Sequence, residues 1–197
     1  MSVSMSIMKR MAPISLILAT LLFASCRNVD QELLTAASRA DSAAIHLNLN
    51  RGANPNTNLQ PGETALGLLL NRYKGSDSAR REIIAQDVIT LLVHGADPNA
   101  LHHGFTPLQI AAGLGNETIV THILAHGANP SQETRAGLAP IWQCVYANDF
   151  RISLHLLEAG ANPNALDAEG RTPLQYLRIK GFIKTPLMIQ LRDHGGR

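Results

Sequence analysis

Apolar residues recur along this chain in short blocks that have the spacing of amphipathic helices. Two blocks follow one another between residues 106 and 127: Leu108, Ala111 and Ala112, and then Ile119, Val120, Ile123 and Leu124. Each block places its apolar side chains on one face of a helix. Gly115 lies between the blocks, where a turn with positive φ is expected, and Gly127 follows the second block, as glycine commonly does at a helix C-terminus. The pattern predicts a pair of short helices.

Residues at the ends of these blocks indicate where each helix begins. Thr106 is a suitable N-cap, and Pro107 suits the first helical position, where no amide hydrogen is needed. Asn116 is placed to begin the second helix. Ala139 stands where the equivalent blocks have threonine, so we expect that helix to be capped more weakly, by ~1 kcal/mol.

Two motifs repeat in phase along the chain. The motif Gly-Ala-(Asn/Asp)-Pro-(Asn/Ser) begins at Gly52, Gly95, Gly127 and Gly160, with spacings of 43, 32 and 33 residues. The second motif begins at Gly62, Gly104, Gly137 and Gly170, with spacings of 42, 33 and 33 residues. Repetition at a fixed period predicts an array of similar structural units.

These motifs resemble those of the ankyrin repeat family, in which Thr-Pro-Leu-His marks a unit of about 33 residues. The strings Thr106-Pro107-Leu108 and Thr172-Pro173-Leu174 carry the resemblance, which covers residues 30–197. It implies an all-α solenoid of helix-turn-helix units joined by β-hairpin-like loops. About five units are expected, near residues 30–58, 59–100, 101–131, 132–165 and 166–197. The family's histidine position holds Gly67, Gln109, Trp142 and Gln175.

The second unit exceeds the repeat length by about 10 residues, and the excess lies near residues 73–78. Helical spacing continues beyond it, so we expect a longer loop and a longer second helix. Neutral drift in a surface loop and an insertion on a binding face both explain the excess. Thr185 follows Thr172 too closely to open another unit, and we interpret it as the N-terminus of the final helix.

Residues 1–25 have the features of a signal peptide. Lys9 and Arg10 precede an apolar run over residues 11–23, which is shorter than the ~20 residues that span a bilayer. Residues 22–26 resemble the bacterial lipobox, which implies that Cys26 is lipidated and that residues 26–29 are a short tether. An ordinary secretory leader cleaved nearby is the alternative. Arg27, rather than aspartate, follows Cys26, a pattern that resembles lipoproteins of the outer membrane facing the periplasm.

Composition narrows the function classes. The chain has 17 basic and 15 acidic residues, and without Lys9 and Arg10 the two signs balance, which argues against nucleic-acid binding. Aromatic residues make up only 4% of the chain, so the core must be mostly leucine, isoleucine and alanine. Cys144 aligns with Ala111 at a buried position, and we expect an inert thiol there.

The histidines are the main candidates for other chemistry. His94, His126 and His194 each precede a glycine that ends a helix, and we interpret them as favourable partners of the helix dipole. The adjacent His102 and His103 are expected to be exposed at a hairpin tip, where a weak surface metal site is the alternative. We expect no cofactor and no catalytic residue. The alternative function is a small hydrolase or metal-dependent enzyme that uses the second unit's insertion and the hairpin tips.

The family resemblance implies a protein partner held on a concave face, formed by hairpin tips and the exposed ends of the first helices. The positions carried over are His102, His103, Phe105, Leu114, Arg135, Leu138, Tyr146 and Arg171. Phe105 and Leu138 are apolar at positions where stability alone does not require an apolar residue. The alternative is that both side chains pack against neighbouring hairpin tips. Together these features predict a binding module tethered to the cell envelope by lipid.

The last unit is basic. From residue 172 onward it carries Arg178, Lys180, Lys184, Arg192 and Arg197 against the acid Asp193. Contact with acidic lipid headgroups, contact with an acidic partner, and a merely soluble cap face are the three interpretations.

Overall fold

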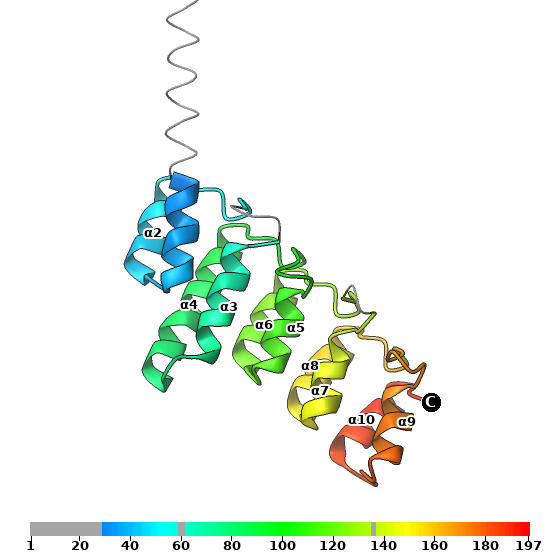
Figure 1. Cartoon of the computed structure of the whole chain (residues 1–197). Coiled ribbons are helices and arrows are strands. Elements are labelled where there is room, and N and C mark those ends of the chain that lie inside the picture. The colour runs from blue at the N-terminus through cyan, green and yellow to red at the C-terminus, as the bar shows by residue number, and fades with distance from the viewer. Residues whose placement is uncertain (1–28, 59–61, 135–136) are drawn as a thin grey trace, which may run out of the picture.

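The computed structural model describes residues 29–58, 62–134 and 137–197, which form pairs of antiparallel helices stacked side by side (Figure 1). The helix at residues 29–39 pairs with α2 (Ser42–Asn50). The next pairs are α3 (Ala65–Lys74) with α4 (Ser78–Val93), α5 (Pro107–Gly113) with α6 (Glu117–Ala125), α7 (Ile141–Ala147) with α8 (Phe150–Glu158), and α9 (Pro173–Ile179) with α10 (Pro186–Asp193). In these ranges the β pairing is limited to an isolated bridge between His102 and Phe105. The expected all-α solenoid is confirmed.

The helices form two layers that run along the stack. The first helices of the units, α3, α5, α7 and α9, contact one another in order, and we call them the inner helices. The second helices, α2, α4, α6, α8 and α10, contact one another in the outer layer. Long loops join successive units along one edge of the stack, the loop edge, and the turns within units lie along the opposite edge, the turn edge (Figure 1).

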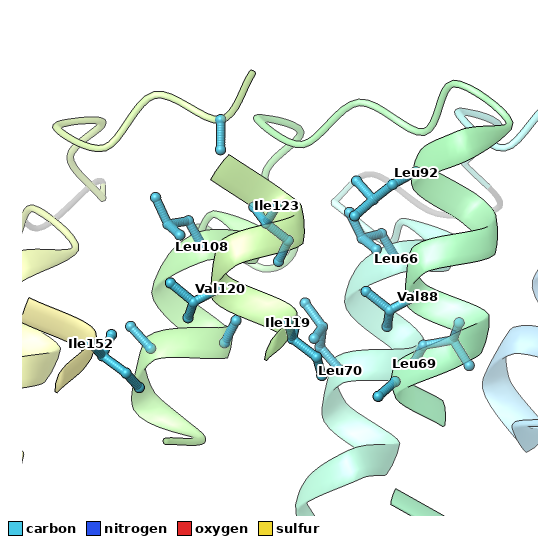
Figure 2. Packing of buried hydrophobic residues seen from close by; sticks show 14 of the residues in the cluster. Leu66, Leu69, Leu70, Val88, Leu92, Leu108, Ile119, Val120, Ile123 and Ile152 are labelled. Atoms are coloured by element: carbon cyan, nitrogen blue, oxygen red, sulfur yellow. The ribbon is translucent and has the colours of Figure 1, made fainter. Parts of the chain in front are cut away.

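A continuous core of small and branched apolar side chains fills the space between the layers (Figure 2). Leu108 from α5 and Ile119 and Ile123 from α6 are fully buried, as the helical spacing predicts. Ala111 and Ala112 are also buried, and their small side chains let neighbouring helices approach closely. Because burial of one leucine or isoleucine side chain contributes roughly 1.5–3 kcal/mol, this core is the main source of stability.

Threonine caps begin most of the inner helices. The Thr106 hydroxyl accepts a hydrogen bond from the Gln109 N–H (3.1 Å), and the Gln109 side chain accepts one from the Thr106 N–H (2.8 Å). This reciprocal capping box satisfies two backbone donors, and Thr172 repeats it in α9. Thr185 caps α10, which confirms its interpretation as the start of the final helix. Helix α7 has no side-chain cap: its N-cap position is Pro140, and Ala139, which replaces the threonine of the other units, has no hydroxyl.

The turns within units use the left-handed backbone region where the sequence requires it. Gly115 has φ +70°, which confirms the turn placed there from the sequence. In the turn between α7 and α8, Asn148 adopts φ 51° in place of glycine, and asparagine is among the residues that tolerate this region best.

The extra residues of the second unit lengthen its helices. The expectation of a longer loop there is wrong. Helices α3 and α4 have 10 and 16 residues, whereas α5 and α6 have 7 and 9. The turn at residues 75–77 is as short as the turn at 114–116. Added helical residues satisfy their own backbone hydrogen bonds, and the Asp77 carboxylate accepts a bond from the Arg80 N–H (2.8 Å) that caps α4.

A ladder of asparagine side chains joins the loops of successive units. The Asn99 amide donates to the Gly127 carbonyl (3.1 Å), and its oxygen accepts from the Asn129 N–H (2.7 Å). Asn56 and Asn164 make the same two bonds to the units that follow them. Ser131 occupies this position in the third loop and accepts only the bond from the next unit (3.0 Å). The final residue of the Gly-Ala-Asn-Pro-Asn motif therefore ties one unit to the next.

Three histidines close the C-termini of outer helices. Nδ1 of His94, His126 and His194 lies 2.8 Å from the backbone carbonyl four residues earlier. A carbonyl can only accept, so each ring donates to an oxygen that also accepts the backbone N–H of the same histidine (3.1 Å) at the end of the helix. This geometry agrees with the helix-end role expected from the sequence.

The last unit closes the stack with polar side chains. Arg178 and Arg192 are exposed, although the equivalent Ala112 is buried and Leu124 packs against the core in a unit that has a following neighbour. A terminal repeat needs such a polar outer face. The last unit therefore has the polar outer face that is typical of a terminal repeat.

Several expectations concern residues outside the described ranges. The leader, Cys26 and Arg135 are among them. Residue 29, which we had assigned to the tether, is already helical, and the Val29 side chain is buried in the core. Within the described part of the chain, no helix is long and apolar enough to cross a membrane.

Candidate protein-binding face

The inner helices enclose a hollow between α3, α5 and α7. Its volume is about 280 Å³, and its walls are Leu70, Asn71, Lys74, Phe105, Gln109, Ile110, Gly113, Leu114 and Gln143. Phe105 and Leu114, both expected at a binding face, therefore lie in one hollow. The Phe105 side chain is 46% exposed there. Apolar area of this kind is available to a partner.

An aromatic cluster continues this surface onto α7 and α9. The ring centroids of Trp142, Tyr146 and Tyr176 lie 5.5 to 5.7 Å apart. Trp142 is buried beneath the other two, and Tyr146 is 48% exposed. Sequence reasoning missed Tyr176, although it occupies the same repeat position as Gln143, which lines the hollow. We call Phe105, Ile110, Leu114, Tyr146 and Tyr176 the inner-helix face.

Arg171 borders the aromatic cluster as part of an ion-pair network. Its guanidinium lies 2.7 Å from the carboxylates of both Asp167 and Glu169, and 5.4 Å from the centre of the Tyr176 ring. Burial raises the pKa of the Asp167 carboxyl, but hydrogen bonds from the Arg171 backbone and guanidinium outweigh this and hold the pKa below its usual value. The sequence predicts Arg171 as a partner-binding position. The structure shows its charge already balanced by two acids.

His102 is buried, so the expectation that it is exposed at a hairpin tip is wrong. Its ring fills the space above Gly67, where an added Cβ would lie 2.1 Å from the imidazole Cγ. Nδ1 accepts a hydrogen bond from the Thr64 N–H (3.2 Å), and Nε2 lies 2.9 Å from the Asn71 amide. Burial lowers the pKa of this ring, and the neighbouring His103 lowers it further. His102 is an internal link between units, whereas His103 is exposed.

The family's histidine position is filled in different ways along the stack. The Gln109 side chain donates to the carbonyls of Gln132 (3.2 Å) and Leu138 (2.6 Å) in the next unit. Gly67 leaves room for the His102 ring instead. Trp142 fills the position with apolar volume, and its buried Nε1 has no acceptor among the residues the structure describes. Each unit thus reaches its neighbour by a different contact.

Leu138 lies at the loop edge in a structural role. Its side chain is half-buried and packs against the core. Its N–H donates to the Thr134 hydroxyl (3.2 Å), and its carbonyl receives the Gln109 bond. These contacts favour the tip-packing alternative for Leu138, whereas the exposed Phe105 remains free for a partner.

The described residues provide few groups for other chemistry. Burial raises the pKa of the Cys144 thiol to about 12, so it stays protonated and inert near neutral pH, as expected. In the parts of the chain that the structure covers, no three His, Cys, Asp or Glu side chains converge as metal ligands would. The geometry of the inner-helix face is suited to contact with another molecule's surface.

Helix pairs that each contact their neighbours, with a polar terminal unit, define a helical repeat protein. A family model described as three copies of ankyrin repeats matches residues 33–134 and 76–167. The chain belongs to the ankyrin repeat family, and the repeats indicate a protein-interaction module. Members of this family are generally binding modules rather than enzymes.

Similar proteins from bacteria and animals share these repeats. The chain is 29% identical over 188 residues to the putative ankyrin repeat protein YahD of Escherichia coli (strain K12), which covers 80% of this chain and 94% of that protein. It is 37% identical over 78 residues to ankyrin repeat and MYND domain-containing protein 1 of Homo sapiens, covering 39% of this chain and 8% of that protein. The likeness to the human protein is therefore confined to a small part of it.

Proposed function

We propose that this chain is a lipid-anchored module of the bacterial cell envelope that holds a protein partner on its inner-helix face. The observation that carries the proposal is the exposure of Phe105 and Tyr146 on the inner layer, with an open hollow next to Phe105. Exposed aromatic side chains beside a hollow have the character of binding hot spots. The module is expected to protect or assist an enzyme of the envelope, or to neutralise a toxin.

The charge of the inner helices supports an acidic partner surface. Helices α3, α5, α7 and α9 contain no aspartate or glutamate. Arg72 and Lys74 lie on α3, and the Lys180 ammonium lies 5.6 Å from the centre of the Tyr176 ring. We therefore expect the partner to place acidic groups around an apolar contact, and its affinity to fall as salt rises.

The test of the binding face is capture from detergent-solubilised envelopes, followed by identification of the partner and measurement of its affinity. Phe105→Ala and Tyr146→Ala should each weaken binding by ~2 kcal/mol or more if they are hot spots. Because both side chains are about half exposed, the thermal midpoint should change little.

Phe150→Ala is the matched control for these variants. Phe150 is 44% exposed, but it lies on the outer helix α8. Its loss should leave the affinity unchanged. A captured partner that binds the Phe105→Ala/Tyr146→Ala double variant as tightly as the natural chain would refute the proposed face.

The proposed anchor rests on residues 22–26, the apolar run before them and the basic pair Lys9 and Arg10. Acyl chains on Cys26 would hold the module at a membrane, and several chains anchor more stably than one. Cells fed labelled palmitate should label the natural chain and not the Cys26→Ser variant. Label that persists in this variant would place the lipid elsewhere.

A further inference from the structure

The turn between α9 and α10 is longer than the other turns of the stack. It covers residues 180–185, whereas the turns at 75–77, 114–116 and 148–149 are shorter. The shorter turns show how little chain is needed to join the two helices of a unit. The extra length at residues 180–185 is therefore not required to close the last unit.

Large apolar side chains of this segment face solvent. Ile183 is 74% exposed, Ile179 is 68% exposed and Phe182 is also exposed. They lie at the turn edge of the last unit, where the turn projects beyond the helices (Figure 1). Exposed apolar groups gathered on one projection usually mark a contact surface.

Basic residues flank these apolar side chains without acidic partners. Arg178, Lys180 and Lys184 alternate with them, and residues 172–192 contain no aspartate or glutamate. None of the three forms an ion pair with a described residue. The acid of the neighbouring turn, Asp149, already accepts backbone hydrogen bonds as the cap of α8. The projection is thus locally cationic although the chain as a whole is nearly neutral.

We infer that the α9–α10 turn (Arg178, Ile179, Lys180, Phe182, Ile183 and Lys184) binds the surface of an anionic lipid bilayer. Apolar side chains on a projecting turn can enter the boundary between headgroups and acyl chains. The long basic side chains beside them reach back to the lipid phosphates. An acidic protein would have to supply a recess for this projection, whereas a bilayer deforms around it.

The position of the turn determines how the stack would lie relative to the membrane. The helix at residues 29–39 begins at the loop edge of the first unit, and the α9–α10 turn lies at the turn edge of the last unit (Figure 1). Contact of the turn with a bilayer brings the far end of the stack to the membrane. The contact does not depend on lipidation of Cys26, which can be tested separately.

The test is flotation of the chain from residue 27 onward with lipid vesicles. This piece contains the whole described core, from Val29 to Leu191. It should bind vesicles of phosphatidylcholine with phosphatidylserine and bind pure phosphatidylcholine far less. Lys180→Gln with Lys184→Gln should lower binding by roughly tenfold or more, and Phe182→Ser with Ile183→Ser should lower it to a similar degree.

The control variant is Arg192→Gln with Arg197→Gln, which removes the same charge from the opposite edge of the same unit. Its binding should change less than about twofold, because attraction to a charged surface decays within a Debye length. Phe182→Trp adds a fluorescent reporter to a chain whose own Trp142 is buried, and its emission should shift to the blue with anionic vesicles. Equal binding to both kinds of vesicle, no binding to either, or equal losses from the turn and control variants would overturn the inference. An acidic protein that protects the turn while vesicles do not bind it would do the same.

Discussion

At the scale of single residues, Gly67 and His102 complement one another. Gly67 stands at the repeat position where the family has histidine. The ring of His102, from the loop of the next unit, fills the space that a side chain at Gly67 would occupy. The His102 ring then receives the Thr64 N–H at Nδ1. A proton on Nδ1 would remove that acceptor in a buried site, so the folded protein needs this imidazole neutral.

This requirement predicts a pH-dependent stability. The folded pKa of His102 lies below its ordinary value of 6.5, because burial disfavours the charged ring. The unfolded chain therefore binds more protons as the pH falls through this window, and unfolding becomes easier. The contribution of His102 should be complete above its unfolded pKa and lost as the pH falls toward the folded pKa. Urea unfolding between pH 7.5 and pH 5 measures this contribution. The range includes the pKa of an unperturbed histidine, about 6.5.

His102→Gln and His103→Gln form the comparison. The first should be less stable at neutral pH by about 1–3 kcal/mol, since it disturbs a buried hydrogen-bonded group, and it should lose less stability on acidification. The second, on an exposed ring, should follow the natural chain. An identical pH dependence for all three proteins would exclude His102 as the responsible group.

Gly115 provides a second test at this scale. Its φ is +70°, and nothing lies within 4 Å of an added Cβ, so any cost of substitution comes from the backbone alone. Gly115→Val should destabilise by at least ~1 kcal/mol, because a β-branched residue is an outlier in this region. Gly115→Asn should cost clearly less. Equal urea midpoints for the two variants would show that the left-handed conformation is not the determining factor.

At the scale of one element, α7 shows what a missing cap does. Its N-terminus lacks the side-chain hydrogen bond that Thr64, Thr106 and Thr172 supply to the other inner helices. Ala139 is buried, as Thr64 and Thr106 are, so the repeat accommodates a threonine at this position. Helix α7 also carries Tyr146 and Trp142, and its stability bears on the candidate site.

Ala139→Thr should therefore stabilise the protein. A restored N-cap is worth about 1 kcal/mol, and the thermal midpoint should rise accordingly. Ala139→Val has the same shape without the hydroxyl and serves as the control. If valine stabilises as much as threonine, the gain comes from filled volume and not from capping.

Between elements, the asparagine ladder sets how firmly units are joined. Ser131 makes one of the two bonds that Asn56, Asn99 and Asn164 make. Ser131→Asn should add the missing bond to the Gly160 carbonyl and stabilise by about 0.5–1.5 kcal/mol. Asn99→Ala should destabilise by a similar amount for each bond lost. A loss of stability in Ser131→Asn would mean that the third loop differs in geometry from its neighbours.

At the scale of the whole molecule, the main contacts of each described helix pair are with its neighbours in the stack. Distant changes should therefore act independently, as in other repeat proteins. Asn56 and Asn164 lie at opposite ends of the stack. The changes in unfolding free energy caused by Asn56→Ala and Asn164→Ala should therefore add in the double variant within about 0.5 kcal/mol. Strong non-additivity in urea titrations would reveal coupling through the length of the stack.

The sequence by itself determined the architecture. The period of Gly-Ala-Asn-Pro-Asn and Thr-Pro-Leu, the caps at Thr106 and Thr185, and the turn at Gly115 are local signals whose chemistry acts within a few residues. Local rules therefore located the helices and the missing cap of α7. The family resemblance picked out Phe105 and Tyr146, and both side chains are about half exposed.

Tertiary structure alone decided which side chains meet across unit boundaries. The burial of His102 depends on a missing Cβ at Gly67, far away in the sequence, and the pairing of Arg171 depends on how one loop folds back on itself. The extra residues of the second unit extended α3 and α4, because helix satisfies backbone hydrogen bonds that a longer loop would leave to solvent. A repeat position predicts where a side chain begins, but its burial and partners depend on the size and charge of the neighbour stacked against it.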